Sequence, residues 1–499
     1  MRVKVLLNNR WAKFEAPKET LRALRAFWSF YPSRWVLENS PKHQAWLNAV
    51  AEAAKEGIPA SDVEGWDGRI SPFAYNRIPA GLFRATWRQA KAELQCKFEI
   101  VRTYMPKLEF KTGLEPAQGK YRFHNKCADK MVAALPYGGG IILAATGAGK
   151  TALAARLFSR VSANCIFISD QKKLLHQNQQ ELADWLKEPI GLVGDSELTV
   201  QRVTAATIQT LQALLRRRAL GKLAPEVQKW LSTPVIAFVD ELHEQLNDRT
   251  KEYLRAANII AVYGMTATLN LDIKANLLDA HSIAGPVVFK YSLERGVKSG
   301  VLTVGSAIQL IFPQRMISNN AGLVYAADVM ENPVKLKACK AIAQILHDNN
   351  RYTVMFAGRL PHIKLLCETV HPIPHRRVDG TIDKEMREKS LKSFEAGKIR
   401  LLVSSRVSKK GVNFKRADVV VDWEEARLPE NTAQKYGRLT RLHVDKRSSL
   451  YVDVATGGKK LHAGTRLRAL RKLGIAVERH YVSSAAEAAD LVRQALEKL

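Results

Sequence analysis

Short runs of apolar residues alternate with longer amphipathic stretches from about residue 120 onward. Uninterrupted apolar runs of this length are typical of parallel strands that helices cover on both faces. The first series comprises Ile141–Ala144, Cys165–Ile168, Val235–Val239 and Ile259–Tyr263. The second series comprises Thr353–Phe356, Leu401–Val403, Val419–Val421 and Leu450–Val452. The alternation predicts βαβ units in two consecutive doubly wound sheets, joined near Gly296–Gly300.

The first 115 residues differ in composition from the rest. Six of the nine tryptophans precede residue 90: Trp11, Trp28, Trp35, Trp46, Trp66 and Trp87. Large aromatic side chains are usually buried, so we expect most of these indoles to form the core of a small separate domain. The alternative is that one or two of them stack on exposed bases.

Charge narrows the class of partner. The 77 lysines and arginines outnumber the 48 acidic residues, giving a net charge of +29, which favours a polyanion such as nucleic acid or an anionic membrane. No apolar run approaches the ~18 residues of a membrane-spanning helix. The apolar stretch near residue 1 is too short for a signal peptide. The five cysteines are scattered, which argues against a disulfide framework or a zinc site. We therefore expect a soluble intracellular protein without a membrane partner.

A segment in the last part of the chain is strongly basic. Residues 435–480 hold twelve lysines and arginines against three acidic residues. The helical pattern around Arg466, Arg468, Arg471 and Lys472 indicates either phosphate contacts or an ordinary solvated helix face.

The strongest chemical signal is a glycine-containing loop between the first apolar run and an expected helix. Such a loop cradles phosphates with its backbone N–H groups and with the N-terminus of the helix. The residues expected to surround the phosphates are Ala145, Thr146, Gly147, Ala148, Gly149, Lys150 and Thr151. We expect Lys150 to reach the β- and γ-phosphates and the Thr151 hydroxyl to bind Mg²⁺. The alternative is a glycine turn before an ordinary helix.

Two acids follow the apolar run Val235–Val239, where the ligands of open α/β sheets bind. We expect Asp240 to hold Mg²⁺, Glu241 to orient or deprotonate the attacking water, and His243 to couple the site to its surroundings. A zinc motif is excluded because Asn247 stands where a second histidine is required.

Hydrolysis at such a site also calls for positive charge at the γ-phosphate. In the segment Gln434–Arg441, the spacing of three places Arg438 and Arg441 on one helix face. We expect these arginines and Gln434 to complete the site from the second sheet, so that closure of the two lobes depends on ATP. Taken alone, the segment is a basic helix.

In this order, the motifs resemble those of superfamily 2 helicases of the DExH type over about residues 118–455. The box Asp240–His243 and the segment Gly264–Thr268 carry the resemblance together with the phosphate loop and Gln434–Arg441. The resemblance implies two RecA-like lobes, ATP and Mg²⁺ as cofactors, and nucleic-acid contacts from several motif loops. The residues implied in those contacts are Gln171, Lys172, Thr207, Gln209, Thr268, Arg359, Ser405 and Arg406.

Two segments depart from the family pattern. The nucleotide-recognition segment has Arg122 and Asn125 where the family has an Arg-x-Tyr-Gln segment, so another nucleotide could be accepted. In the motif that includes Gly411, Asn413 replaces the usual aspartate. Neither change removes a metal or phosphate ligand. The expected nucleotide-binding positions therefore include Arg122, Asn125, Gly411 and Asn413.

Within the superfamily, the chain resembles the UvsW-like phage recombination helicases, which are similar to XPB-type helicases. This implies a DNA-binding domain at 1–115, lobes at 116–298 and 299–460, and a basic helical extension at 461–499. It also implies a motor that unwinds or branch-migrates DNA in recombination, repair or fork remodelling. The alternatives are an RNA helicase, a motor of a restriction complex, and a non-catalytic nucleic-acid clamp; protein partners are not predicted.

Overall fold

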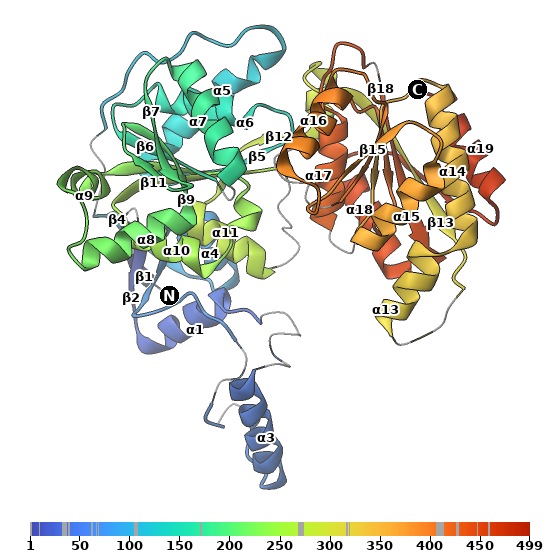
Figure 1. Ribbon diagram of the computed structural model, residues 1–499. Coiled ribbons are helices and arrows are strands. Elements are labelled where there is room, and N and C mark those ends of the chain that lie inside the picture. The colour runs from blue at the N-terminus through green and yellow to red at the C-terminus, as the bar shows by residue number, and fades with distance from the viewer. Residues whose placement is uncertain are drawn as a thin grey trace. The chain divides into compact units, whose positions relative to one another are not determined.

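The computed structural model describes the chain except for residues 1, 9, 32–36, 38–39, 61–62, 66, 68, 104–107, 170–171, 268–273, 316–317, 319, 406–413, 426–428, 447 and 458–459. Contacts between residues divide the chain into two compact units (Figure 1). The first contains residues 1–116, 124–143 and 151–290, and the second contains 117–123, 144–150 and 291–499.

The first unit begins with a small α+β domain. Its sheet has the order β3-β2-β1-β4, in which β1 pairs antiparallel with β2 and parallel with β4. The elements are β1 (Arg2–Leu7), β2 (Trp11–Glu15), α1 (Lys18–Trp28), α3 (Pro41–Lys55), β3 (Arg77–Pro79), α4 (Ala80–Glu93) and β4 (Lys97–Arg102). The interpretation of the indoles as core holds for Trp28, which is fully buried and donates a hydrogen bond to Thr86 Oγ1 at 2.9 Å. Trp11, Trp46 and Trp87 are half-buried, whereas Trp35 and Trp66 lie outside the described residues.

The first RecA-like lobe has a sheet of order β12-β5-β11-β10-β6-β9-β7-β8. Its strands are β5 (Gly139–Ala144), β6 (Asn164–Ser169), β7 (Ile190–Gly194), β8 (Glu197–Thr199), β9 (Val203–Thr207), β10 (Val235–Val239), β11 (Ile259–Thr266) and β12 (Val287–Tyr291). Its helices are η2 (Gly119–Tyr121), α5 (Phe123–Ala134), η3 (Leu135–Tyr137), α6 (Lys150–Phe158), α7 (Lys172–Leu186), α8 (Ile208–Ala219), α9 (Pro225–Ser232), η4 (Leu242–Glu244), α10 (Asp248–Ala256) and α11 (Lys274–Ala284).

Along this sheet the chain runs in one direction from β5 through β6 to β7 and returns in the other from β9 through β10 and β11 to β12, which places helices on both faces of the sheet. Right-handed crossovers carry α6 and α7 over one face and α8, α10 and α11 over the other, as Figure 1 shows. Because β5, β11 and β10 are neighbours that pair in parallel, their carboxyl ends lie at one edge of the sheet, where a ligand can bind.

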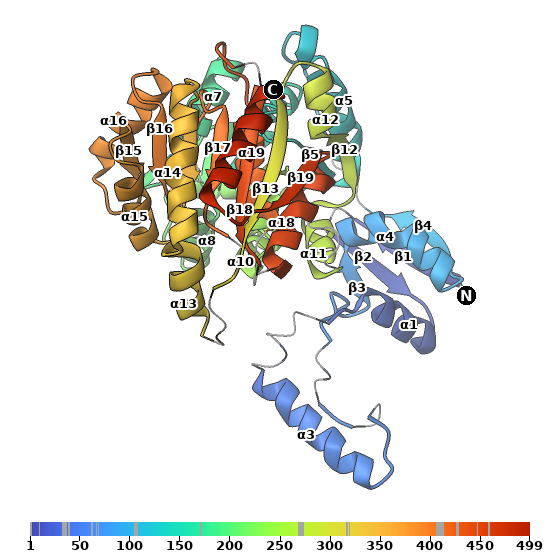
Figure 2. The same ribbon diagram turned by 90° about the vertical axis from the view of Figure 1, so that its right-hand side faces the viewer.

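The second lobe has a sheet of order β15-β16-β14-β17-β18-β13-β19, and its neighbouring strands pair in parallel (Figure 2). Its strands are β13 (Val304–Phe312), β14 (Thr353–Phe356), β15 (His375–Val378), β16 (Leu401–Ser404), β17 (Val419–Asp422), β18 (Ser448–Thr456) and β19 (Val477–Tyr481). Its helices are α12 (Leu293–Lys298), α13 (Ala321–Val324), the π-helix η5 (Tyr325–Met330), α14 (Pro333–Asp348), α15 (Leu360–Val370), α16 (Lys384–Glu395), α17 (Pro429–Leu439), α18 (Lys460–Lys472) and α19 (Ala485–Glu497).

The two parallel sheets and the small N-terminal domain confirm the predicted fold class. One difference concerns the end of the chain, which is not helical throughout. Strand β19 extends the second sheet by pairing with β13, and α19 then packs on the core of this lobe through Val492 and Leu496. Glu478, Arg479 and His480 stand in succession in β19 and leave no continuous apolar run, so the pattern that predicted eight of the strands did not predict this one.

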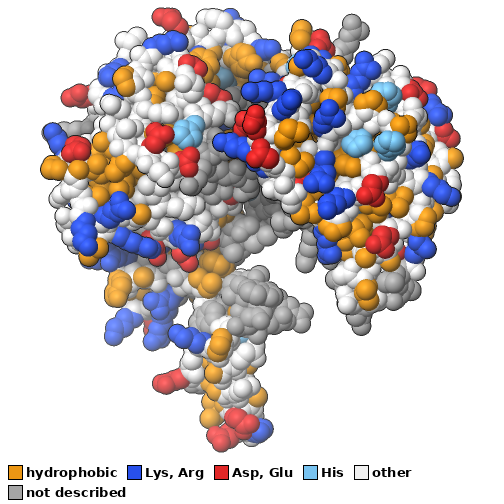
Figure 3. Space-filling model, viewed as in Figure 1, with side chains coloured by type: hydrophobic (Ala, Val, Ile, Leu, Met, Phe, Trp, Pro, Cys, Tyr) orange, Lys and Arg blue, Asp and Glu red, His pale blue; other side chains and the backbone are white. Residues whose placement is uncertain are grey.

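Lysine and arginine side chains are spread over the visible face among acidic side chains and do not gather in one patch (Figure 3). Within the described part of the chain, no helix combines the length and the apolar character that crossing a membrane requires.

Candidate nucleotide and nucleic-acid site

The phosphate loop connects β5 to α6. Gly147 and Gly149 have φ angles of +89° and +80°, a left-handed conformation that residues with a side chain rarely adopt. Between them, the Ala148 N–H donates to the Ala145 carbonyl at 3.0 Å. Lys150 begins α6, so this helix presents its N-terminus to the loop. Alternating left-handed residues next to a helix start form the concave array of N–H groups that binds phosphate.

The end of α17 packs against this loop within the second unit. A Cβ atom on Gly437 would lie 2.6 Å from Thr146 Cβ, so no larger residue fits there. A Cβ atom on Gly147 would lie 3.4 Å from Arg441 Cγ. Gln434 and Arg438 are half-buried on the same helix. The structure therefore brings the predicted segment Gln434–Arg441 to the phosphate loop.

The two acids occupy a strained turn after β10. All five residues of β10 are buried, and the Asp240 N–H donates to the Ile168 carbonyl at 3.0 Å, which continues the pairing with β6. The next residue, Glu241, has φ +44° and ψ +56°. A left-handed conformation costs a residue with a side chain about 1–3 kcal/mol and is concentrated at functional sites. The turn keeps both carboxylates half-buried at the carboxyl end of β10.

His243 connects the acids to the neighbouring strand. Its Nδ1 atom lies 2.8 Å from Thr266 Oγ1 and 3.5 Å from Glu241 Oε2. Thr266 is fully buried at the end of β11. The sequence interpretation selected Thr268 from this motif, and Thr268 lies outside the described residues. Thr266 is a residue that the prediction missed, although it stands in the same Gly264–Thr268 segment.

A buried lysine supports the arginine-bearing helix. Lys435 forms ion pairs with Asp422 and, at 2.8 Å, with Glu424, and all three side chains are at most 2% exposed. Tyr451 donates a further hydrogen bond to Asp422 at 2.6 Å. Burial alone would raise the pKa of Asp422, but the Lys435 ammonium and these hydrogen bonds hold that pKa below its ordinary value. No sequence pattern pointed to Lys435, which occupies a variable position of the motif.

The segment that was predicted to recognise the nucleotide contains an aromatic stack. Phe123 is buried and stacks on Tyr291, with ring centroids 3.7 Å apart and an interplanar angle of 8°. Arg122, which precedes Phe123, is exposed, and Asn125, two residues after Phe123, is half-buried. The stack fixes the start of α5, where the family pattern would have a tyrosine and a glutamine.

The residues predicted to contact nucleic acid have different environments. Thr207 is buried, with Oγ1 3.0 Å from Thr210 Oγ1, whereas Gln209 is exposed. Arg359 is exposed and its guanidinium lies 4.0 Å from the centre of the Tyr325 ring. Ser405 is buried directly after β16. Gln171, Thr268, Arg406, Gly411 and Asn413 lie outside the described residues, as does the side chain of Lys172.

One predicted contact must be corrected. Arg466 is completely buried, and its Nε donates to Asp453 Oδ1 at 2.7 Å, with both side chains 0% exposed. It is a structural partner of a carboxylate inside β18 and does not reach the surface. Arg468, Arg471 and Lys472 are exposed on the same helix.

Two protein families match successive parts of the chain. Residues 126–271 match the family described as "Type III restriction enzyme, res subunit", and residues 335–443 match the "Helicase conserved C-terminal domain". These domains imply ATP-dependent helicase activity on nucleic acid, and ATP is typically used with Mg²⁺.

Three known proteins illustrate the similarity. The Debaryomyces hansenii pre-mRNA-splicing ATP-dependent RNA helicase PRP28 is 21% identical over 37% of this chain, and the match spans about a third (32%) of that protein. The structure of UvsW from phage T4 is 17% identical, covers 96% of this chain and 100% of that chain, and has a TM-score of 0.43. The ATP-dependent Type ISP restriction-modification enzyme LlaBIII bound to DNA is 13% identical, covers 81% of this chain and 35% of that chain, and has a TM-score of 0.52.

The match to the restriction-enzyme subunit family ends before the second lobe, and the match to the helicase C-terminal domain lies inside it. With these two domains in tandem, the chain belongs to the superfamily 2 helicases.

Proposed function

We propose that this chain is an ATP-dependent DNA helicase or translocase that remodels branched DNA. The observation that carries the ATP-driven step is the packing of Gly437 and Arg441 against the phosphate loop. This packing sets an arginine-bearing helix beside a loop whose glycines have the conformation of a phosphate cradle. A bound magnesium–nucleotide complex would supply the phosphoanhydride bond whose hydrolysis drives the motor.

Each residue of the site has a proposed task. Lys150 binds the β- and γ-phosphates, and Thr151 and Asp240 hold the metal ion. Glu241 orients the attacking water, and its strained backbone fixes the direction of its carboxylate. Gln434, Arg438 and Arg441 stabilise the charge that develops on the γ-phosphate. Lys435 positions these three residues through its buried pairs with Asp422 and Glu424.

Three observations support DNA as the partner. The net charge of +29 favours a polyanion. The first matched domain is described as part of a restriction enzyme, and a structural neighbour was determined bound to DNA. The proposed nucleic-acid contacts are the exposed Gln209, Arg359, Arg468, Arg471 and Lys472, together with Thr207 and Ser405. The preference for branched DNA rests on the sequence resemblance, as does the division at residues 115, 298 and 460.

An RNA helicase is the second candidate, because the match to PRP28 is a match to an RNA helicase. Motors of this superfamily act on the nucleic-acid backbone, so the same ATP site serves both candidates.

The test is ATP hydrolysis by the full chain with no nucleic acid, single-stranded DNA, a forked duplex, a four-way junction and matched RNA. We expect the strongest stimulation with the fork or the junction, and no turnover by Lys150→Ala. Strongest stimulation by RNA would move the protein to the RNA helicases. Salt-sensitive DNA binding without any turnover by the wild-type protein would identify a non-catalytic clamp.

A further inference from the structure

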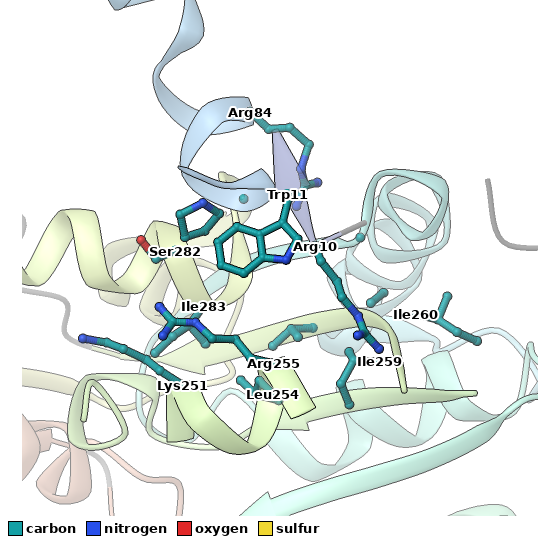
Figure 4. A pocket seen from close by; sticks show the side chains of 15 residues that line it. Arg10, Trp11, Arg84, Lys251, Leu254, Arg255, Ile259, Ile260, Ser282 and Ile283 are labelled. Atoms are coloured by element: carbon teal, nitrogen blue, oxygen red, sulfur yellow. The ribbon is translucent and has the colours of Figure 1, made fainter. Parts of the chain in front are cut away.

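A pocket with a cavity volume of about 70 Å³, partly open to solvent, lies where the N-terminal domain meets the first lobe (Figure 4). Arg10 and Trp11 enter it from the start of β2, and Arg84 enters it from α4. Lys251 and Arg255 line it from α10, and Ile259 to Val262 at the start of β11 form its floor. All of these residues belong to the first unit.

The pocket lies far from the phosphate loop. Gly138, immediately before β5, lines the pocket, whereas the phosphate loop begins after Ala144 at the other end of that strand. A strand rises about 3.3 Å per residue, so the six residues of β5 separate the two places by roughly 20 Å. A ligand here would therefore not touch the residues proposed to bind the nucleotide phosphates.

The charged lining of the pocket is entirely basic. Arg10, Arg84, Lys251 and Arg255 line it, and no acidic side chain is among the lining residues. Two of these cations already have partners, because Arg10 Nη2 donates to the Ala257 carbonyl at 2.8 Å and Lys251 pairs with Asp279 at 2.8 Å. The other two, Arg84 and Arg255, have no carboxylate partner within the described parts of the chain.

Arg84 is the most informative of the four residues. Its Nη1 donates to the Gly139 carbonyl at 3.3 Å, while its Nε is shielded from solvent and has no hydrogen-bond partner among the described residues. Burial, assisted by the charge of Arg102, lowers the pKa of Arg84 to about 10, so the guanidinium is still charged at neutral pH. A shielded cation without a counter-charge is costly unless a bound anion compensates it.

Arg255 supplies a second available cation. Its side chain is exposed and forms no hydrogen bond or ion pair with the residues that the structure describes, and its guanidinium lies 5.9 Å from the centre of the Trp11 ring. Arg77 lies over the same indole at 5.1 Å. Because guanidinium groups already lie beside this ring, we regard Trp11 as an apolar wall of the pocket and not as a surface for stacking a base.

We propose that this pocket binds a phosphate group through Arg84 and Arg255, and that the phosphate belongs to a nucleic-acid backbone. Guanidinium groups bind phosphate oxygens through paired, charge-assisted hydrogen bonds, which fits two arginines that lack carboxylate partners. The second part rests on the proposed function, because a free phosphate-bearing molecule offers the same chemistry. A backbone bound here would contact the N-terminal domain and the first lobe at once.

The test compares Arg255→Gln and the double variant Arg84→Gln/Arg255→Gln with the control Arg217→Gln. Arg217 is an exposed arginine on α8 of the same lobe and lies outside the pocket. Binding of a labelled blunt DNA duplex to the full-length protein is measured by fluorescence anisotropy over a series of salt concentrations. We expect Arg255→Gln to weaken binding several-fold and to reduce the slope of log affinity against log salt by about one. We expect the double variant to lose more DNA affinity than Arg255→Gln, and the control to lose little.

Each outcome bears on a different part of the proposal. Equal losses of duplex binding in Arg255→Gln and the control would overturn the assignment of the pocket to a nucleic-acid backbone, and this comparison does not depend on the folding of the double variant. Inorganic phosphate is tested separately by thermal unfolding. If it stabilises the wild type but not the pocket variants, while duplex binding is unchanged in all of them, the pocket is supported and its assignment to nucleic acid is overturned. If the wild type binds no duplex at all, the proposed function fails, and the phosphate measurement still tests the pocket.

Discussion

The two lobes share a fold but differ in how their sheets are held together. In the first lobe the six inner strands, β5, β11, β10, β6, β9 and β7, contain no charged residue. In the second lobe the inner strands β17 and β18 carry Asp422 and Asp453, each paired with a buried cation from a neighbouring helix. A third buried pair joins Lys335 of α14 to Glu425. The first sheet is therefore stabilised by apolar burial, and the second also depends on correctly matched charges.

This difference corresponds to the tasks proposed for the lobes. The first lobe presents its acids on a strained turn, and an apolar sheet supports that turn without competing for its charges. The second lobe must hold arginines in place on a helix, and the buried pairs of Lys435 attach that helix to the sheet. Buried ion pairs contribute little net stability, but removing one partner leaves an uncompensated charge. The lobes should thus respond differently to substitution.

The largest expected effect is the loss of ATP turnover when Glu241 of the first lobe is replaced. Glu241→Gln keeps the shape of the side chain but removes the base, so ATP turnover at saturating nucleic acid should fall about a hundredfold to ten-thousandfold. The free energy of unfolding in urea should remain close to that of the wild type. An unchanged turnover would remove Glu241 from the proposed site.

The second lobe should lose stability and turnover together. Lys435→Met leaves Asp422 and Glu424 without their cation and should lower the free energy of unfolding by about 3–5 kcal/mol. The apolar control Ile236→Val in the first sheet should cost only about 1 kcal/mol. Urea unfolding measures both, and the triple variant Lys435→Met/Asp422→Asn/Glu424→Gln should recover part of the loss. Equal effects of Lys435→Met and the control would contradict the contrast between the sheets.

A smaller effect isolates the strain in the turn of the first lobe. Glycine adopts the conformation of residue 241 without the cost borne by a residue with a side chain. Glu241→Gly should therefore be about 1 kcal/mol more stable than Glu241→Ala, although both lack the carboxylate. The comparison is made by thermal or urea unfolding. If the alanine variant is as stable as the glycine variant, the turn stores no strain.

A pH dependence of stability is also expected in the second lobe. Lys446 is buried and donates to the carbonyls of Lys415, Ala417 and Leu439 at 2.7–3.0 Å. Burial lowers its pKa from 10.5 to about 8. Between pH 8 and 10.5 the unfolded chain binds a proton that the folded chain has lost, so the free energy of unfolding rises with pH in this window. Urea unfolding at several pH values should show a rise that Lys446→Met lacks.

The contrast between the sheets also explains what the sequence could predict. The apolar run of β10 located Asp240 and Glu241 at the edge of a sheet, and the glycine pattern located the phosphate loop. In the second lobe, β15 contains two arginines and a histidine, and β19 contains Glu478, Arg479 and His480 in succession, so neither produces an apolar run. A rule based on continuous hydrophobicity finds the first kind of strand and misses the second.

The buried ion pairs of the second lobe were not predicted from the sequence for a related reason. A basic run such as the one around Arg466 was interpreted as surface, because sequence alone does not tell which cation faces the sheet. One signal was available: Asp453 interrupts an apolar strand, and a buried carboxylate requires a partner. The inward-facing cation of the next helix would have been the first residue to consider.

The position of β13 has a mechanical consequence for a motor. This strand follows α12 in the chain and is paired along its nine residues with β18, and also with β19 on its other side. A tension transmitted through the chain from the first lobe acts along β13. Parallel hydrogen bonds loaded in that direction share the force and must yield together, whereas those of a strand peeled from an edge yield one at a time. The second lobe is thus built to take up a pull without unravelling.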